Sequence, residues 1–158
     1  MRIEAGLEDL GLVLPEPMQA PSGLRLPFAW VRVRGNRSYI SGHFALNPDG
    51  SVAQPLGKVG AEVSVEEGCQ PAHHVALAHL ANLKRALEDL DRVTAWLRPS
   101  PWSTQPRVQP RRRQSQRLLG PHLEPYSPEV GMHARSSTGM TLPLNVSVNC
   151  EAEVEIDG

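Results

Sequence analysis

The sequence predicts an α+β fold in which helices pack on one face of an antiparallel sheet. Three patterns carry this prediction: a leucine stripe at 72–90, a polar–apolar alternation at 144–156, and a turn signal at Gly35-Asn36 between two strand-like runs. With 158 residues, the chain has the length of one domain and can bury a core.

The N-terminus reads as a short amphipathic helix over residues 2–12. Ile3, Leu7 and Leu10 lie on one side of it, and Pro15, Pro17 and Pro21 then enforce an extended connector. We interpret 1–17 as a helical arm laid against a single domain that spans 18–158.

The run "LPFAWVRVRGNRSYISGHFAL" predicts a β-hairpin. Val31 and Val33 alternate with polar or amphipathic residues, which is the period of a half-exposed strand. Gly35-Asn36 is a two-residue turn signal, and "RSYIS" supplies the partner strand. A second turn is expected at 47–50, "NPDG".

A long helix is expected at 72–90. Ser64 and Glu67 fit a capping box before it, and Pro71 either kinks the helix or marks the start of its regular part. The apolar stripe recurs at steps of three and four through Leu77, Leu80, Leu83, Leu87 and Leu90.

The C-terminal run from Leu144 to Ile156 predicts one long strand. Its even positions are apolar and its odd positions are polar, which gives one dry face and one wet face. Cys150 falls on the dry face, so we expect a buried thiol and not a reactive one.

The stretch from Arg98 to Arg117 has a different composition. It holds six Arg and four Pro and no acidic residue, so it carries +6 while the rest of the chain carries −7. Composition favours a disordered linker. The alternative is a nucleic-acid-binding arm built on Arg111-Arg112-Arg113, although Trp102 is its only ring for base stacking.

Other function classes find little support. His73 and His79 are six residues apart and cannot share a metal from one helix face, and the sequence has no glycine-rich phosphate loop, so no metal or cofactor is expected. The N-terminal residues are too acidic for a signal peptide, and no run is long enough to span a membrane. We expect a cytoplasmic protein without a membrane partner.

The segment "GMHARSSTGMTLPLNV" at 131–146 carries the most suggestive chemistry. Arg135 lies between a turn-like Gly and a hydroxyl cluster, just before the last strand. An Arg held at a strand edge can bind a carboxylate through two parallel hydrogen bonds. A solvated surface Arg is the alternative that these residues leave open.

Several of these segments together resemble the RidA (YjgF) family. "LPFAWVRVRGNRSYISGHFAL" is similar to the family's opening, "GKVGAEVSVEEG" and "LANLKRALEDLDRV" to its first helix and the approach to it, and "HARSS" followed by "LPLNVSVNCEAEV" to its C-terminal motif. The arm ending "GLVLPEP" suggests the RidA-like subgroup with an N-terminal extension. The resemblance covers roughly 20–97 and 126–156.

The resemblance implies a chorismate-mutase-like α+β fold, assembled as a homotrimer with clefts between subunits. It implies hydrolysis of reactive enamines and imines to 2-oxo acids and ammonia, with no cofactor. Arg135 occupies the family's carboxylate-binding position, and Phe28, Ser136 and Ser137 are the other expected substrate contacts. The expected catalytic residues are Arg135, Asn149 and Glu151.

This sequence departs from the family pattern at three of these positions. Ser137 replaces a Cys, Phe28 replaces a Tyr, and Asn149 stands where RidA proper places a Glu. An amide can orient a water molecule but cannot take its proton, so Glu151, on the same face of the strand, is the expected substitute. The alternative function is a non-catalytic trimer that binds a small carboxylated metabolite. An RNA-related endoribonuclease or translation-inhibitor activity ranks last, because no acid–base pair for RNA cleavage is evident.

The family places a strand and a helix where this chain has its Arg/Pro-rich stretch. The length fits those elements, but proline and arginine at this density predict neither, so we expect an irregular segment at 98–125. A pair of compensating frame shifts between about Arg98 and Tyr126 would explain a replacement at constant length.

Overall fold

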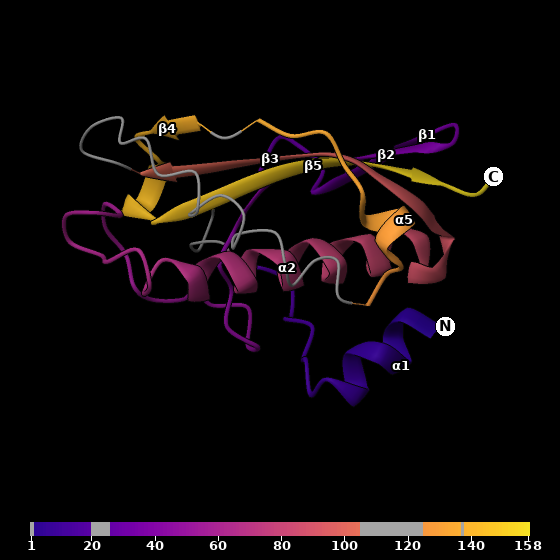
Figure 1. The fold of residues 1–158 in the computed structure, drawn as a ribbon, viewed down its shortest axis with the longest axis horizontal. Coiled ribbons are helices and arrows are strands. Elements are labelled where there is room, and N and C mark those ends of the chain that lie inside the picture. The colour runs from indigo at the N-terminus through magenta and orange to yellow at the C-terminus, as the bar shows by residue number, and fades with distance from the viewer. Residues whose placement is uncertain (1, 20–25, 105–124, 137) are drawn as a thin grey trace.

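The computed structural model describes residues 2–19, 26–104, 125–136 and 138–158. A five-stranded sheet forms one layer, helix α2 covers one of its faces, and helix α1 lies farther from the sheet than α2, near one end of it (Figure 1). The strands are β1 (Val31–Arg34), β2 (Arg37–Phe44), β3 (Val93–Thr104), β4 (Thr138–Met140) and β5 (Val148–Ile156). The helices are α1 (Arg2–Asp9), α2 (Cys69–Leu87) and α5 (Pro128–Gly131), with short 3-10 turns η1 (Leu90–Arg92) and η2 (Pro143–Asn145).

The order of strands in the sheet is β1-β2-β5-β3-β4. All neighbouring strands run antiparallel except β3 and β4, which are parallel. The chain between β3 and β4 is long enough to return to the starting end of the sheet, as a parallel pair requires. The α+β class with a helix on one face is therefore confirmed, and the sheet is mixed at its β4 edge.

The predicted hairpin is confirmed. Val31 pairs with Ile40 and Arg34 pairs with Arg37, with Gly35-Asn36 as the turn. Gly35 has φ +60°, a conformation that favours glycine.

Helix α2 begins at Cys69, three residues before the expected start, and ends at Leu87. The two hydrogen bonds of the predicted capping box are formed, since Glu67 N donates to Ser64 Oγ at 3.1 Å and Ser64 N donates to Glu67 Oε2 at 2.8 Å. They close the turn before α2 and do not cap the helix itself, whose N-cap is Gly68 without a side-chain hydrogen bond. Because α2 begins at Cys69, Pro71 lies in the first turn of the helix. Backbone N–H groups in that turn have no intrahelical acceptor, so a proline there costs no helical hydrogen bond. Glu88, in the left-handed conformation, ends the helix before the expected Leu90.

The main core lies between α2 and the even-numbered face of β5. Ile3 and Leu7 of the arm join this core, with 6% and 2% of their surface exposed. Leu10 was expected on the same side but is 51% exposed, because α1 ends at Asp9 and the chain turns away. The domain and sheet residues of this cluster are Ile40, Leu77, Leu80, Leu83, Leu87, Leu90, Val93, Trp96, Tyr126, Ala152, Val154 and Ile156.

The connector after the arm is tied to the turn at 47–50. Gln19 N donates to Gly50 O at 3.1 Å, and Glu16 N donates to Pro48 O at 3.0 Å. A Cβ atom at Gly50 would lie 2.3 Å from the carbonyl oxygen of Pro17, and φ is +81° there. Only glycine fits this approach of two backbones.

The last strand is shorter than expected. It begins at Val148, not at Leu144, because Leu144 and Asn145 adopt φ +56° and +54° within η2. Leu144 is consequently 61% exposed instead of continuing the dry face. Pro143 is the first residue of this turn. A proline there indicates a turn before the strand, but the polar–apolar alternation taken alone predicted a strand from Leu144.

The expectation that no strand forms beyond Arg98 was wrong. Strand β3 continues to Thr104 and keeps its register with β5 from Arg98 to Ser103. Pro99 and Pro101 are two residues apart, so both ring nitrogens point to the same side of the strand, away from β5, and no ladder hydrogen bond is lost. β4 lies on that side but pairs only from Trp102 onward. Residues 105–124, including Arg111-Arg112-Arg113, lie outside the described part of the chain.

Among the described helices, none combines the length and the apolar character that a bilayer span requires.

Candidate active site

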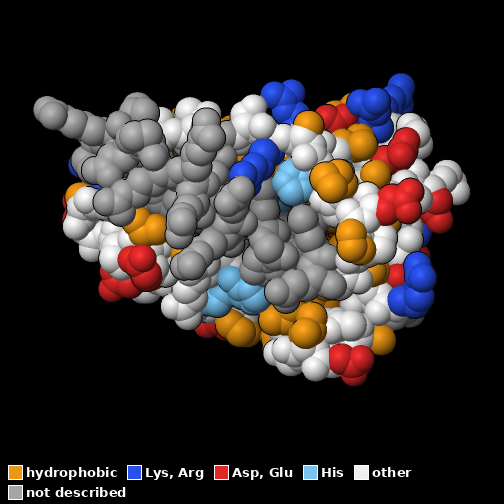
Figure 2. All heavy atoms as spheres, viewed as in Figure 1, with side chains coloured by type: hydrophobic (Ala, Val, Ile, Leu, Met, Phe, Trp, Pro, Cys, Tyr) orange, Lys and Arg blue, Asp and Glu red, His pale blue; other side chains and the backbone are white. Residues whose placement is uncertain are grey.

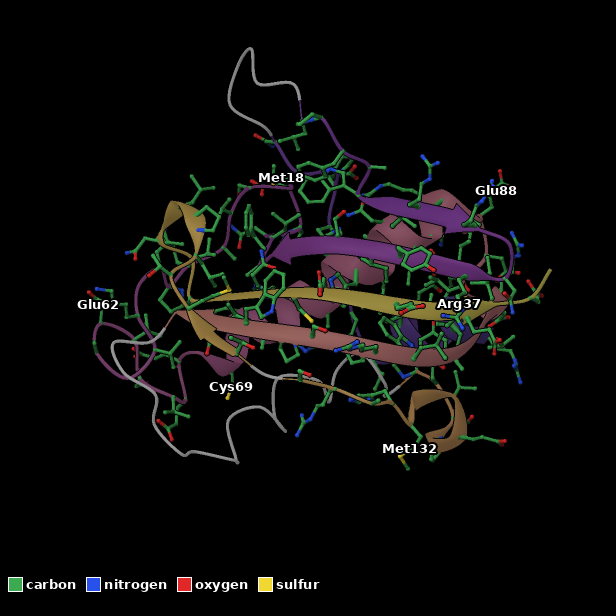
Figure 3. All side chains as sticks on the ribbon, turned by 90° about the horizontal axis from the view of Figure 1, so that it is seen from above. Met18, Arg37, Glu62, Cys69, Glu88 and Met132 are labelled. Atoms are coloured by element: carbon green, nitrogen blue, oxygen red, sulfur yellow. The ribbon has the colours of Figure 1, made fainter. Side chains whose placement is uncertain are left out.

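The face of the sheet opposite α2, here called the open face, presents the odd-numbered residues of β5 and their neighbours across the strands. Figure 3 looks down on this face, with Arg37 on it. Arg37 Nη1 donates to Glu153 Oε1 at 2.8 Å, and Asn36 Nδ2 donates to Glu155 Oε1 at 3.0 Å. This part of the open face therefore carries an Arg–Glu ion pair and a second glutamate bound to an amide.

Asn149 lies on the open face near the start of β5, the central strand of the sheet. Phe44 of β2 and Trp102 of β3 are its direct partners across the strands, and only 5% of Asn149 is exposed. Its Oδ1 atom is buried and has no hydrogen-bond partner among the described residues. A buried acceptor without a donor costs about 1–3 kcal/mol, so this amide is held in place at an energetic cost.

A β-bulge in β2 makes room for this amide. The register between β2 and β5 shifts between Ile40 and His43, which leaves Ser41 and Gly42 unpaired. A Cβ atom at Gly42 would lie 2.6 Å from Asn149 Oδ1, so the Asn149 side chain can occupy this position only beside a glycine.

Glu151 lies two residues beyond Asn149 on the same face, as predicted. It is exposed, and its register partner is Ser100 of β3. On the side of β2 it faces the bulge. Glu151 is therefore a solvent-accessible carboxylate beside a buried amide.

Arg135 lies in the extended segment between α5 and β4. The preceding residue is fixed to the outer edge of β3, since Ala134 N donates to Leu97 O at 3.2 Å. The side chains of Arg135 and Ser136 are exposed. Ser137, another expected contact, lies outside the described residues.

Phe28 lies at the opposite edge of the sheet. Half of its surface is exposed, and its ring packs edge-on against Trp30 with centroids 5.2 Å apart. The adjacent Ala29 O accepts a hydrogen bond from Ser41 Oγ at 2.8 Å, which places Phe28 beside the bulge. Strands β2, β5 and β3 separate this edge from Arg135. Three intervening strands leave four interstrand spacings of about 4.8 Å each, so the two backbones are roughly 19 Å apart.

One chain thus brings Asn149 and Glu151 together and leaves Phe28 and Arg135 on opposite sides of them. Sequence reasoning missed Gly42, Phe44 and His43, although each belongs to the run that predicted the hairpin. A "Ser-Gly-His" in a strand pattern is a possible signal of a bulge, since glycine within a strand marks a close approach of backbones.

A cluster of carboxylates lies elsewhere, where the arm meets the domain. Glu4, Asp89 and Asp91 each place an oxygen within 4.8 Å of the others. Asp91 accepts from Arg2 N at 2.6 Å and Ile3 N at 3.0 Å, and Glu4 Oε1 accepts from Leu90 N at 3.1 Å. These bonds explain the cluster as a cap that holds the arm. A cavity of about 250 Å³ adjoins it, lined by Arg2, Ile3, Asp91, Val93, Pro125, Tyr126, Ser127 and Val130.

Comparison with known proteins gives full-length matches. No family model matches the sequence. The chain is 30% identical to "Protein TCP17" of Trypanosoma cruzi, over 99% of this chain and 95% of that protein. A candidate endoribonuclease of Shewanella oneidensis, solved as a crystal structure, is 26% identical, with a TM-score of 0.78 over 98% of this chain and 99% of the other.

The crystal structure of RidA from an Antarctic Psychrobacter has the same fold at lower identity. It is 18% identical to this chain, with a TM-score of 0.58 over 88% of this chain and 94% of that one. The two chains therefore share their overall fold.

Proposed function

The chain belongs to the RidA (YjgF) family and has its chorismate-mutase-like α+β fold, and on this premise we propose that it hydrolyses reactive enamines and imines. The substrate class is 2-imino acids, and the products are 2-oxo acids and ammonia. The observation that carries the proposal is the placement of Arg135. Arg135 is an exposed residue, and its backbone is anchored one residue earlier to the edge of β3.

Arg135 would bind the substrate carboxylate. A guanidinium presents two parallel N–H groups that match the two oxygens of a carboxylate, and a fixed backbone reduces the entropy lost on binding. Ser136 and Ser137 would add hydroxyl donors beside it, and Phe28 would supply an apolar wall for the substrate side chain.

The reaction itself is an addition followed by an elimination. An enamine first tautomerises to the imine; the oxygen of water then bonds to the C=N carbon while nitrogen gains a proton, which gives a carbinolamine. The amino group of the carbinolamine then gains a second proton and leaves as ammonia when the C–N bond breaks. The hydroxyl loses its proton as the C=O bond forms. Glu151 is the accessible carboxylate that can accept and return these protons. Asn149 can only orient the water or the adjacent backbone.

The proposal includes a homotrimer in the cytoplasm. Phe28 and Arg135 stand on opposite edges of one sheet, so a site that uses both requires two subunits placed side by side. The open face carries Arg37 and the exposed Glu151, so it offers charges of both signs to another copy. A trimer mass in solution and the enzyme's recovery in a cytosolic fraction are the corresponding tests.

The second candidate is a trimer that binds a small carboxylated metabolite without turning it over. One observation favours it: the central position that would hold a carboxylate base is an amide, and its oxygen has no accessible surface. Arg135 would keep its role in this case.

An RNA-related activity is the third reading. The Shewanella relative carries an endoribonuclease description, but Arg111-Arg112-Arg113 lie outside the described residues. On the described part of the face in Figure 2, basic and acidic side chains are interspersed. A surface that binds the phosphate backbone of RNA would need clustered positive charge. Salt-dependent RNA binding that disappears on deletion of 98–117 would support this third reading.

Incubation with 2-iminobutanoate separates the first two candidates. The proposal expects formation of 2-oxobutanoate and ammonia above the rate in buffer, and loss of this excess in Arg135→Ala. Stabilisation of the protein by 2-oxobutanoate in a thermal melt, without any turnover of the imine, would instead favour the binding function.

A further inference from the structure

His43 is a buried polar residue directly beneath the bulge. Only 2% of it is exposed, and its ring lies 4.8 Å from the rings of both Trp30 and His79. It pairs with Cys150 in register, so its side chain faces α2, on the side of the sheet opposite Asn149. The chemistry proposed above does not use it.

The hydrogen bonds of His43 define its tautomer. Nδ1 lies 2.6 Å from Ser41 O, and a carbonyl can only accept, so Nδ1 carries the proton. Nε2 lies 2.8 Å from Asn82 Nδ2, which donates to it. The ring is therefore neutral, with one nitrogen as donor and the other as acceptor.

The orientation of Asn82 is fixed by two further bonds. Its Nδ2 also donates to Ala78 O at 3.1 Å, and its Oδ1 accepts from Arg85 Nη1 at 3.4 Å. A reversed amide would turn its oxygen to a carbonyl and its NH₂ to a guanidinium, and both contacts would repel. Protonation of His43 Nε2 would likewise set two donors against each other. Burial is the main cause that lowers the pKa of His43 to about 4, in agreement with a neutral ring.

Ser41 transmits this arrangement to the open face. Its carbonyl is held by His43, its N donates to Trp30 O at 2.9 Å, and its Oγ donates to Ala29 O at 2.8 Å. The residue that follows is Gly42, against which the Asn149 amide packs. The segment that carries Phe28 and the bulge that supports Asn149 thus converge on one serine.

We infer that His43 is the positioning residue of this site: its Nδ1–H holds the Ser41 carbonyl, and through it the bulge that sets Gly42 against Asn149 and Phe28 beside them. It is no acid–base catalyst, since both nitrogens are engaged and the ring lies on the far face of the sheet. The inference concerns the geometry of the site for which hydrolysis is proposed, and it can be tested without that activity.

Two substitutions of His43 separate its hydrogen bonds from its bulk. His43→Asn keeps an N–H near the position of Nδ1, whereas His43→Leu removes both polar atoms at similar bulk. Leu83→Ala is the control for a destabilised core, because Leu83 is a fully buried member of the main core that makes no polar contact through its side chain. In hydrolysis of 2-iminobutanoate, His43→Leu is expected to lower kcat by about 10- to 100-fold with KM nearly unchanged, since Arg135 is intact. His43→Asn should recover most of kcat, and equal loss in His43→Leu and Leu83→Ala would overturn the inference.

NMR gives the readout that does not depend on turnover. Imidazole nitrogen shifts of His43 should report the Nδ1–H tautomer down to about pH 5. The side-chain amide signals of Asn149 should move in His43→Leu and stay near their wild-type positions in His43→Asn and Leu83→Ala. An Nε2–H tautomer, or Asn149 signals unchanged in His43→Leu, would refute the positioning role. Absent hydrolysis in the wild type would refute only the proposed function.

Discussion

Gly42 and Asn149 approach so closely that a Cβ atom at position 42 would lie 2.6 Å from Asn149 Oδ1. No real Cβ contact is that short, so the amide and the bulge define each other's positions. The open face is therefore organised by a backbone feature of β2 as much as by the side chains of β5.

Gly42→Ala should displace the Asn149 amide. Forcing a methyl group into this contact is expected to cost about 1–3 kcal/mol of unfolding free energy. The kcat for imine hydrolysis should also fall in Gly42→Ala, because the Asn149 amide is displaced. Gly6→Ala is a matched control in α1, where the nearest atom to a new Cβ is 3.9 Å away, and it should stabilise by about 0.5–1 kcal/mol. Urea unfolding of both variants checks this, and equal behaviour would contradict the close contact.

Acid should destabilise the protein through His43. Its folded-state pKa, about 4, is below the ordinary value of 6.5, so the unfolded chain takes up the proton first as pH falls. Its contribution to stability is complete above about pH 6.5 and is lost on approaching pH 4, with a slope of up to about 1.4 kcal/mol per pH unit.

Among the groups around His43, the Ser41 carbonyl raises the pKa of the imidazole through its hydrogen bond, but the effect of burial is larger. Arg85 lowers its pKa further, and burial raises the pKa of the Cys150 thiol on β5 to about 12, so that thiol stays neutral. His79 and Asn82 face it from α2. Urea midpoints at pH 7, 6 and 5 should converge between wild type and His43→Asn as the pH falls. Parallel curves would show that His43 binds no fewer protons in the folded state.

The arm should contribute to stability through one leucine and not the other. Leu7 is 2% exposed and belongs to the main core, whereas Leu10 is 51% exposed. Leu7→Ala is expected to cost about 2–5 kcal/mol, and Leu10→Ala to stay within about 0.5 kcal/mol. Thermal melts of the two variants give the comparison, and a similar loss in both would mean that the arm packs differently.

The two cysteines should differ in reactivity. Cys150 is buried, and desolvation raises its thiol pKa to about 12, while Cys69 is partly exposed. Because the thiolate is the reactive form, iodoacetamide at pH 8 should modify Cys69 in the native protein and both residues in urea. Mass spectrometry of the digest identifies the modified residue. Labelling of Cys150 in the native protein would contradict the burial of this thiol beneath the sheet.

Much of this fold is predictable from periodicity. The leucine spacing of α2, the alternation along β5 and the Gly35-Asn36 turn each specify their element locally, because burial on one face repeats at the period of the backbone. β3 beyond Arg98 was not predictable in this way. Its prolines are compatible with a strand only because their nitrogens face away from β5, which is a property of the register and not of the composition.

The site was predictable in part. The shared face of Asn149 and Glu151 follows from strand alternation, and Arg135 was singled out by its motif. The burial of Asn149 could not be derived, since an odd-numbered polar residue reads as solvated until the bulge and Trp102 are placed around it. His43 is hidden for a similar reason. Its role depends on a hydrogen bond to a carbonyl two residues away and on Asn82 from a distant helix.

The most direct test of the proposed function is the kcat/KM for 2-iminobutanoate of the wild type against Arg135→Ala. Lys58→Ala, an exposed lysine in the loop between β2 and α2, is the control for the loss of one positive charge. We expect hydrolysis above the buffer rate in the wild type and in Lys58→Ala, and a loss of about 10- to 150-fold in Arg135→Ala, since a charge-assisted pair with a carboxylate is worth about 1.5–3 kcal/mol. Equal rates in all three proteins, or no hydrolysis above buffer in the wild type, would contradict it.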